Sequence, residues 1–133
     1  MINSEHPLCW MGQEILMDEF EKLRKLVDKF SEERDWTQFH SPKNLAASIS
    51  IEASELLEIF QWTNPSHSEL QENSDLRSRV SEELADIVIY CVRFCSLQGI
   101  EFASMILEKI KINEEKYPIS TSKGSNKKYN NLD

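Results

Sequence analysis

The chain has 133 residues, of which 40% are hydrophobic and 29% are charged. This length and balance are typical of one globular domain with a single core and exclude two ordinary domains. The formal net charge is −8, which argues against a duplex-binding protein because nucleic-acid phosphates repel an acidic surface. A small anionic ligand is not excluded, because a bound metal ion reverses the local sign of an acidic site.

Cysteine usage and hydropathy indicate a reducing compartment, with the cytoplasm as the default. The three cysteines, Cys9, Cys91 and Cys95, lack zinc-ligand spacing, and we expect Cys91 and Cys95 to be buried free thiols. The first ten residues do not resemble a signal peptide. No apolar stretch approaches the roughly 20 residues that span a membrane, so no membrane partner is expected.

The N-terminal third predicts one helix and a connection. Residues 1 to about 16 show no clear period and are interpreted as a loose arm or a short extra helix. Asp18 is a candidate cap for a first helix, whose apolar residues from Phe20 to Phe30 follow at helical spacing. Residues 36–42 then form a connection that contains two aromatics and a histidine.

Three further helices are expected, over residues 43–62, 75–98 and 101–116. Pro65, Gly99 and Pro118 follow their ends, and residues 66–74 are expected to be a loop. Residues facing the core are expected at helical spacing on the first two of these helices: Leu45, Ile49, Ala53, Leu56, Leu57 and Phe60 on one, and Leu76, Val80, Leu84, Ile87, Val88, Cys91, Phe94 and Cys95 on the other. Phe102, Ile106 and Ile110 are expected to point inward from the last.

The domain organisation follows from these elements. An all-α domain is predicted for residues 18–118, between an N-terminal arm of residues 1–17 and a C-terminal tail of residues 119–133. The tail is rich in Ser, Lys and Asn and is flexible by composition.

Four carboxylates interrupt the apolar helices at a spacing that predicts a metal site. Glu52 and Glu55 lie three residues apart, as do Glu83 and Asp86, so each pair presents two carboxylates from one side of a helix. The small residues Ala53, Ser54 and Ala85 between them would allow two helices to approach closely. Four like charges in one place repel, and Mg²⁺, which prefers oxygen ligands, would relieve that repulsion.

Other interpretations of these acids remain open. Glu58 and Glu82 lie near the same faces and are either outer ligands, a water-positioning base or solvated charges. A di-iron or di-manganese bundle requires Glu-x-x-His on two helices, and no histidine here stands three residues after an acid in a helix, since His40 and His67 are expected in loops. A non-enzymatic helical interaction module with solvated acids is the remaining alternative.

The pattern of motifs resembles the MazG-like all-α NTP pyrophosphohydrolases, and most closely their dCTP pyrophosphatase branch. The resemblance covers roughly residues 20–130 and rests on the two acidic pairs together with the stretches Glu33–His40, Pro42–Leu45, Glu58–Trp62, Glu82–Tyr90, Lys109–Pro118 and Ser122–Tyr129. The sequence departs from the pattern at Ile51 and at Ser54, where glycine is common in that branch.

The resemblance implies a fold, a reaction and an assembly. The expected fold is a bundle of four to five helices completed by oligomerisation, usually a homotetramer built as a dimer of dimers. The expected reaction converts a nucleoside triphosphate and water to the monophosphate and pyrophosphate with Mg²⁺, for which Mn²⁺ is a possible substitute. Ile89, Tyr90 and Val92 agree with oligomerisation, because they leave the helix apolar on more than one side.

The resemblance also implies roles for individual residues. Glu52, Glu55, Glu83 and Asp86 match the catalytic metal ligands. Trp36 and Trp62 match aromatics that hold the base, although either could be a core residue. His40 resembles a base- or sugar-contacting histidine, or is a surface residue.

A second group of residues matches positions that contact the sugar and phosphates. Tyr90 lies one turn after Asp86, while Lys109, Asn113 and Tyr117 share one face of the last helix because they are spaced by four. Lys123, Ser125 and Lys128 in the tail are expected to close over the phosphates on binding.

Overall fold

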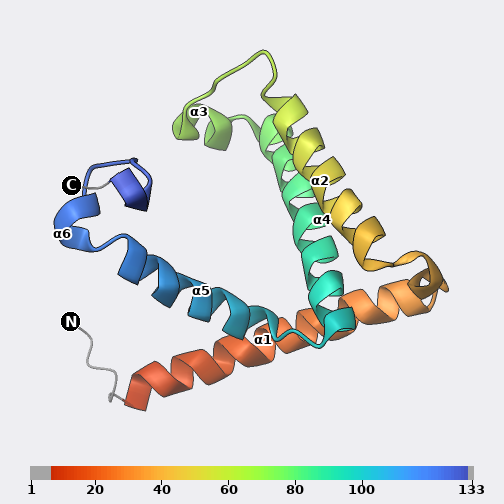
Figure 1. The fold of residues 1–133 in the computed structure, drawn as a ribbon. Helices are drawn as coiled ribbons and strands as arrows, with labels where there is room; N and C mark the ends of the chain where they lie inside the picture. Colours follow the sequence, from red (N-terminus) through yellow and green to blue (C-terminus); the bar gives the residue numbers. More distant parts are fainter. Residues whose placement is uncertain (1–6, 132–133) are drawn as a thin grey trace.

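The structure is a computed structural model that describes the backbone of residues 7–131 and the side chains of residues 18–131. Within that range all regular structure is helical, which confirms the all-α prediction (Figure 1). In chain order the elements are α1 (Pro7–Glu32), η1 (Trp36–Phe39), α2 (Pro42–Ile59), α3 (His67–Glu72), α4 (Ser74–Gln98), α5 (Phe102–Lys116), α6 (Ile119–Ser122) and η2 (Tyr129–Asn131).

The first helix is longer than the sequence indicated. α1 begins at Pro7 and runs without a break to Glu32, so Asp18 lies inside the helix and does not cap it. Residues 7–17, expected as part of a separate arm, extend α1, and residues 1–6 of that arm lie outside the described range. The sequence does not predict this early start, because residues 7–17 show no clear apolar period.

Local hydrogen bonds explain where α2 starts and where it stops. The Ser41 hydroxyl accepts a hydrogen bond from the Asn44 backbone N–H at 3.1 Å, and Pro42 occupies the first turn, where its missing N–H costs nothing. The helix ends at Ile59, three residues earlier than predicted. Trp62 therefore lies beyond the helix, in the turn before Pro65.

The segment expected as a loop contains the short helix α3, which corrects the placement of His67 in a loop. Ser66 and Glu69 form a reciprocal capping box at its start. Asn73 then caps α4 by accepting from the Leu76 N–H at 3.0 Å. Gly99 ends α4 with a φ of 66°, a left-handed conformation that glycine adopts without strain.

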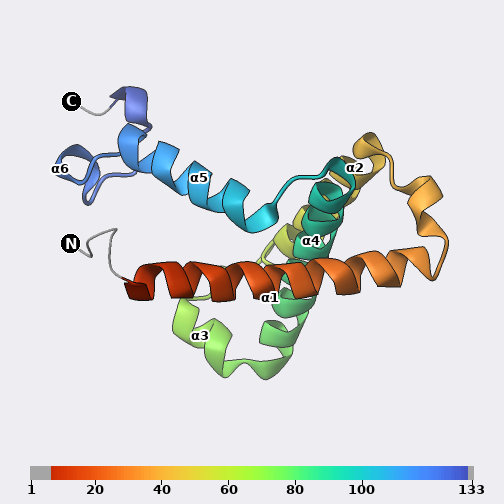
Figure 2. The same ribbon diagram turned by 90° about the horizontal axis from the view of Figure 1, so that it is seen from below.

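α2 and α4 run antiparallel and form the most extensive helix pair, as Figure 1 shows. α1 crosses the C-terminal half of α4, and α5 starts beside the same crossing (Figure 2). The buried apolar residues gather where these helices meet: Leu45, Val92, Cys95 and Ala103. The core therefore lies at one end of the α2–α4 pair, and it leaves the remainder of that pair less covered.

Both cysteines of α4 are free thiols, as predicted. Cys95 is buried and Cys91 is half-buried. Burial raises the pKa of both thiols, so they are poor nucleophiles and serve packing.

Many residues predicted to face the core are exposed in the single chain. Leu57 is 70% exposed, and Leu84, Val88, Ile106 and Ile110 are also open to solvent. The accessible surface of the chain is 10675 Å², whereas a compact monomer of 15.5 kDa has about 7,200 Å². The helical periods were correct, but the faces they define are not covered by the rest of this chain.

α5 leaves the α2–α4 pair and extends along the same side as the N-terminal half of α1 (Figures 1 and 2). The rings of Phe20 and Phe102 meet at 5.3 Å and fix its start. The tail, expected to be flexible, contains α6 and η2, and the Tyr129 ring packs edge-on against Tyr117 at 6.0 Å. Residues 132 and 133 of the tail lie outside the described range.

In the described part of the chain no single helix is both long and apolar enough to cross a membrane. α4 and α5 reach that length and composition only when taken together, and the chain bends by 102° between them.

Candidate metal centre and adjoining pocket

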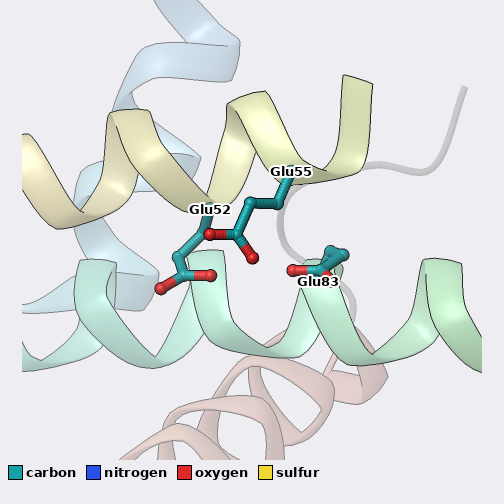
Figure 3. Close-up of side chains that lie close together, drawn as sticks. All are labelled: Glu52, Glu55 and Glu83. Atoms are coloured by element: carbon teal, nitrogen blue, oxygen red, sulfur yellow. The ribbon is translucent and has the colours of Figure 1, made fainter. Parts of the chain in front are cut away.

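Three of the four predicted metal ligands converge between α2 and α4. Glu52 and Glu55 point from α2 toward α4, and Glu83 points back from α4, as Figure 3 shows. One carboxylate oxygen from each lies within 4.8 Å of the others. Residues some thirty positions apart in the sequence thus supply one cluster of oxygen atoms.

The cluster is electrostatically strained. Partial burial raises the pKa of Glu52 above its ordinary value, and the charges of Glu55, Asp86 and Glu83 raise it further. Burial likewise raises the pKa of Glu83, with added repulsion from Glu55, Asp86 and Glu82 that the Arg79 guanidinium partly offsets. These acids therefore favour any cation that can replace the missing positive charge.

Asp86 lies one turn after Glu83 on α4 and is not part of the closest cluster. It is nevertheless near enough for its charge to act on both Glu52 and Glu83. It also lines the neighbouring pocket. Asp86 thus connects the acidic cluster to that pocket.

The donor set fits a hard divalent cation. All converging atoms are carboxylate oxygens, and Glu55 is exposed, which leaves room for water or phosphate oxygens to complete a coordination shell. Mg²⁺ prefers such sites and typically takes only a few ligands from the protein.

A pocket of about 400 Å³ opens between α1, η1 and α4 beside Asp86. It brings together three residues that the sequence singled out for substrate contact, Trp36, His40 and Tyr90, with an otherwise largely apolar lining. The Trp36 ring is 43% exposed and meets Phe30 edge-on at 5.7 Å. A flat aromatic wall with a few polar groups suits a planar ring.

Trp62 does not share that pocket. It is 88% exposed and lines a second hollow of about 350 Å³ together with Glu55, Glu58, Glu83 and Arg79. The two tryptophans thus flank the acids from different sides. The Trp36 ring forms part of a largely apolar pocket wall, whereas the Trp62 ring is mostly exposed.

The remaining predicted contacts are not brought to the acids in this chain. Lys109, Asn113 and Tyr117 lie on α5, and Lys123, Ser125 and Lys128 follow in the tail, well away from the α2–α4 pair (Figure 1). Their roles in binding stay predictions that require a second chain or a rearrangement.

The small residues between the acids do not line the contact between α2 and α4 in the way we expected. Ala53, Ser54 and Ala85 are exposed, and the Ser54 hydroxyl donates to the Ser50 carbonyl oxygen of its own helix at 2.8 Å.

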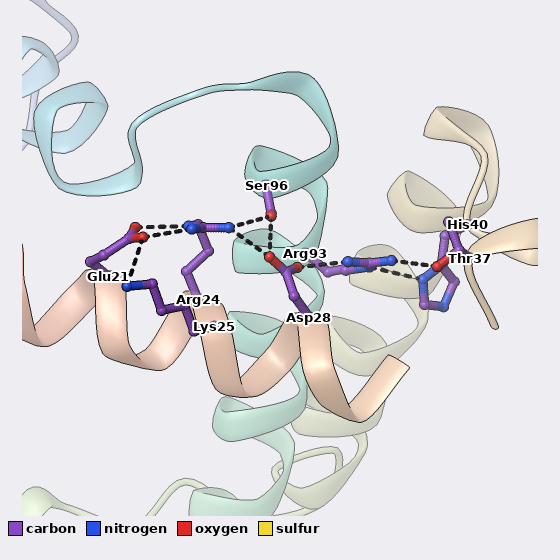
Figure 4. Close-up of polar contacts among 8 residues, drawn as sticks. All are labelled: Glu21, Arg24, Lys25, Asp28, Thr37, His40, Arg93 and Ser96. Carbon is purple, nitrogen blue, oxygen red and sulfur yellow. Dashed lines mark hydrogen bonds and ion pairs between the residues drawn. The ribbon is translucent and has the colours of Figure 1, made fainter. Parts of the chain in front are cut away.

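Sequence reasoning missed three charged residues near the site. Arg79 stands four residues before Glu83, a spacing from which the contact could have been found. Arg93 lines the Trp36 pocket and pairs with Asp28 of α1 at 2.6 Å (Figure 4). Nothing in the local sequence connects Arg93 with Asp28, because they lie 65 residues apart.

Comparison with known proteins shows the family to which the chain belongs. Residues 47–132 match the MazG-like family, and this stretch includes both acidic pairs. The chain belongs to the MazG-like family, as the motifs predicted.

Relatives within this family extend the comparison. The chain is 35% identical over 113 residues to a rat protein named dCTP pyrophosphatase 1 and 38% identical to the bovine protein of that name. The match covers 84% of this chain, but it spans only 66% of the rat protein and 67% of the bovine one. The crystal structure of a pyrophosphatase from Archaeoglobus fulgidus is similar with a TM-score of 0.68 and 42% identity, over 75% of this chain and 93% of that one.

Proposed function

We propose that this protein is a Mg²⁺-dependent nucleoside triphosphate pyrophosphohydrolase. The observation that carries the proposal is the convergence of Glu52, Glu55 and Glu83 within 4.8 Å beside a pocket that shares Asp86. In the reaction a water oxygen forms a bond to the α-phosphorus, the bond from that phosphorus to the bridging oxygen breaks, and pyrophosphate leaves. The water proton passes to a carboxylate or to solvent.

The chain's own residues bind and orient the substrate. Trp36 stacks on the base, while Asp86 stands between the base pocket and the acids and so limits where the α-phosphate can lie. Bound Mg²⁺ supplies positive charge that neutralises the phosphate oxygens of the triphosphate. We expect a carboxylate of the cluster that does not ligate the ion to accept the proton of the attacking water.

For the substrate we propose a deoxycytidine triphosphate, either dCTP or a base-modified dCTP. Two observations support it: the relatives named dCTP pyrophosphatase 1, and a pocket whose volume and aromatic wall suit one heterocycle. The biological role would be control or sanitation of the nucleotide pool, for which the cytoplasm is the fitting location.

We further propose that the working form is a homo-oligomer, a tetramer in the first instance. The accessible surface exceeds that of a compact monomer by roughly 3,500 Å². α5 has a largely apolar groove, which is lined by Met105, Ile106, Ile110 and Ile112 together with Glu108 and Lys109. A second copy packed there would bury these side chains and could bring Lys109 and Asn113 to the acids of its neighbour.

Turnover assays on ligand variants test the proposal. Wild type with Mg²⁺ should release pyrophosphate from dCTP, whereas Glu55→Gln and Asp86→Asn should abolish turnover with helicity nearly intact. Glu72→Gln, which neutralises an exposed acid of α3, is the matched control and should remain active. Active Glu55→Gln and Asp86→Asn proteins would overturn the ligand assignment, and an inactive wild type would favour the helical interaction module.

A further inference from the structure

Arg93 is held in the core by an ion pair that the proposed reaction does not use. Arg93 is 2% exposed, and its Nη1 donates to Asp28 Oδ1 at 2.6 Å. The Asp28 side chain is 13% exposed, and its other oxygen accepts from Arg24 Nη1 at 2.7 Å and from the Ser96 hydroxyl at 2.6 Å (Figure 4). Asp28 therefore fixes the guanidinium at a defined place on α4.

The other two donor groups of Arg93 reach the connection that follows α1. Nη2 donates to the Thr37 hydroxyl at 2.8 Å, and Nε donates to His40 Nδ1 at 3.3 Å. Figure 4 shows the guanidinium lying between Asp28 on one side and Thr37 and His40 on the other. The guanidinium of Arg93 thus links α4 to α1 and to the connection between α1 and α2, which contributes Trp36 and His40 to the pocket.

The contact with His40 decides which ring nitrogen holds the proton. A guanidinium stays charged and only donates, so the nitrogen facing it must accept. Nδ1 of His40 is therefore unprotonated, and in the neutral ring the hydrogen lies on Nε2. Burial and the positive charge of Arg93 lower the pKa of His40, which keeps the ring neutral near pH 7.

We propose that Arg93, oriented by Asp28, is a positioning residue that fixes His40 as the neutral Nε2–H tautomer and so presents one hydrogen-bond donor to the pocket lined by Trp36 and Tyr90. The ligand it selects is a planar base that offers an acceptor, such as a ring carbonyl, at that edge. A base with an amino group at that edge would place its N–H donor against the Nε2–H donor of His40, with no acceptor between them. The choice of a nucleotide base as the ligand rests on the proposed function, whereas the tautomer of His40 is independent of it.

Nitrogen NMR of the full-length apo protein tests the tautomer without any turnover. The chain has three histidines, and His40→Gln identifies the His40 signals by removing them. At pH 7.5 we expect an unprotonated Nδ1 and a protonated Nε2 for His40. A protonated Nδ1, in either the neutral ring or the imidazolium, would overturn the proposal.

A double-mutant cycle tests whether Arg93 acts through His40. His40→Leu and Arg93→Leu should each lower kcat/KM for dCTP about tenfold, through KM rather than kcat, because His40→Leu removes the hydrogen bond to the base and Arg93→Leu releases the ring that makes it. The double variant should lose no more than either single one. Additive losses, or losses in kcat alone, would show that Arg93 has only a structural role.

Two further variants keep this test decisive. Arg24→Leu removes a guanidinium from the same Asp28 carboxylate but has no bond to His40, so kcat/KM should not change. Arg93→Lys serves where Arg93→Leu does not fold, because it keeps a buried charge opposite Asp28. It cannot hold Thr37 and His40 in the same plane and should raise KM for dCTP. A wild-type KM in Arg93→Lys, or a loss in Arg24→Leu equal to that of Arg93→Leu, would overturn the proposal. If no nucleotide is turned over, the proposed function fails, while the NMR result still decides the tautomer.

Discussion

At the scale of single residues, Glu52 has the most telling environment. It is half-buried, and three other carboxylates raise its pKa by repulsion in addition to the effect of burial. A raised carboxyl pKa means that the folded protein binds protons more tightly than the unfolded chain does. Its effect on stability is therefore favourable at low pH and is lost as pH rises through the raised pKa.

This sign predicts how Glu52→Gln behaves without metal. Below the ordinary carboxyl pKa of about 4.3 the variant and wild type should melt alike, and at pH 7.5 the variant should have the higher Tm because one repulsive charge is gone. Mg²⁺ should raise the Tm of wild type more than that of the variant. Melting curves across pH with EDTA or Mg²⁺ check this. A variant less stable than wild type at pH 7.5 in EDTA would contradict the strained-cluster account.

The two tryptophans should differ in their effect on binding. Trp36→Ala should raise KM for dCTP, because Trp36 forms the wall of an existing pocket. The expected loss of binding free energy is about 1–3 kcal/mol, the contribution of stacking on the base. Trp62→Ala should raise KM less, because that ring is largely exposed. Phe39→Ala is the control for losing an exposed aromatic of η1 that is not part of the pocket lining. Steady-state kinetics that show no change for either tryptophan would remove both from the base site.

At the scale of helices, backbone conformation sets the end of α4, and a substitution at Gly99 tests this. Gly99 closes α4 with positive φ, and an added Cβ would meet no atom within 4 Å. Gly99→Ala should therefore cost about 1 kcal/mol from backbone strain alone, since nothing would clash. Chemical denaturation measures the loss. Gly124→Ala also alters a positive φ, but in the tail and away from the core, and should leave global stability unchanged. Equal losses in both variants would contradict this view of where the core lies.

The helices also show what the sequence could predict. Apolar spacing predicted α2, α4 and α5 to within a few residues, and the three-residue spacing of the acids predicted the Glu52, Glu55 and Glu83 cluster. Spacing could not show the extra turns at the start of α1, which lack an apolar period. It also missed α3, which is short and polar and is stabilised by its Ser66–Glu69 capping box.

Contacts between distant segments were beyond the reach of the sequence. The bonds of Arg93 to Asp28 and His40 join residues 65 and 53 positions apart, and no local period encodes such pairs. Family resemblance identified Trp36, His40 and Tyr90 as substrate contacts, and the structure brings all three to one pocket. Their roles in binding stay predictions.

At the scale of the whole molecule, the exposed apolar faces predict self-association. Sedimentation of wild type should show a dimer or, more in keeping with the proposal, a tetramer. Ile106→Asp and Ile110→Asp place charge in the α5 groove and should shift the protein toward monomer with loss of activity. Lys111→Asp adds negative charge to the same helix outside the groove lining and is the control. A monodisperse, fully active wild-type monomer would refute the assembly.

We propose that the acidic cluster and the Trp36 pocket together hydrolyse a nucleoside triphosphate between its α- and β-phosphates. Phosphorus NMR of dCTP turnover with Mg²⁺ in ¹⁸O-labelled water tests this most directly, because the label marks the phosphorus that water attacks. We expect dCMP with ¹⁸O on its phosphate, together with unlabelled pyrophosphate. Formation of dCDP and orthophosphate, or ¹⁸O in the pyrophosphate, would contradict it.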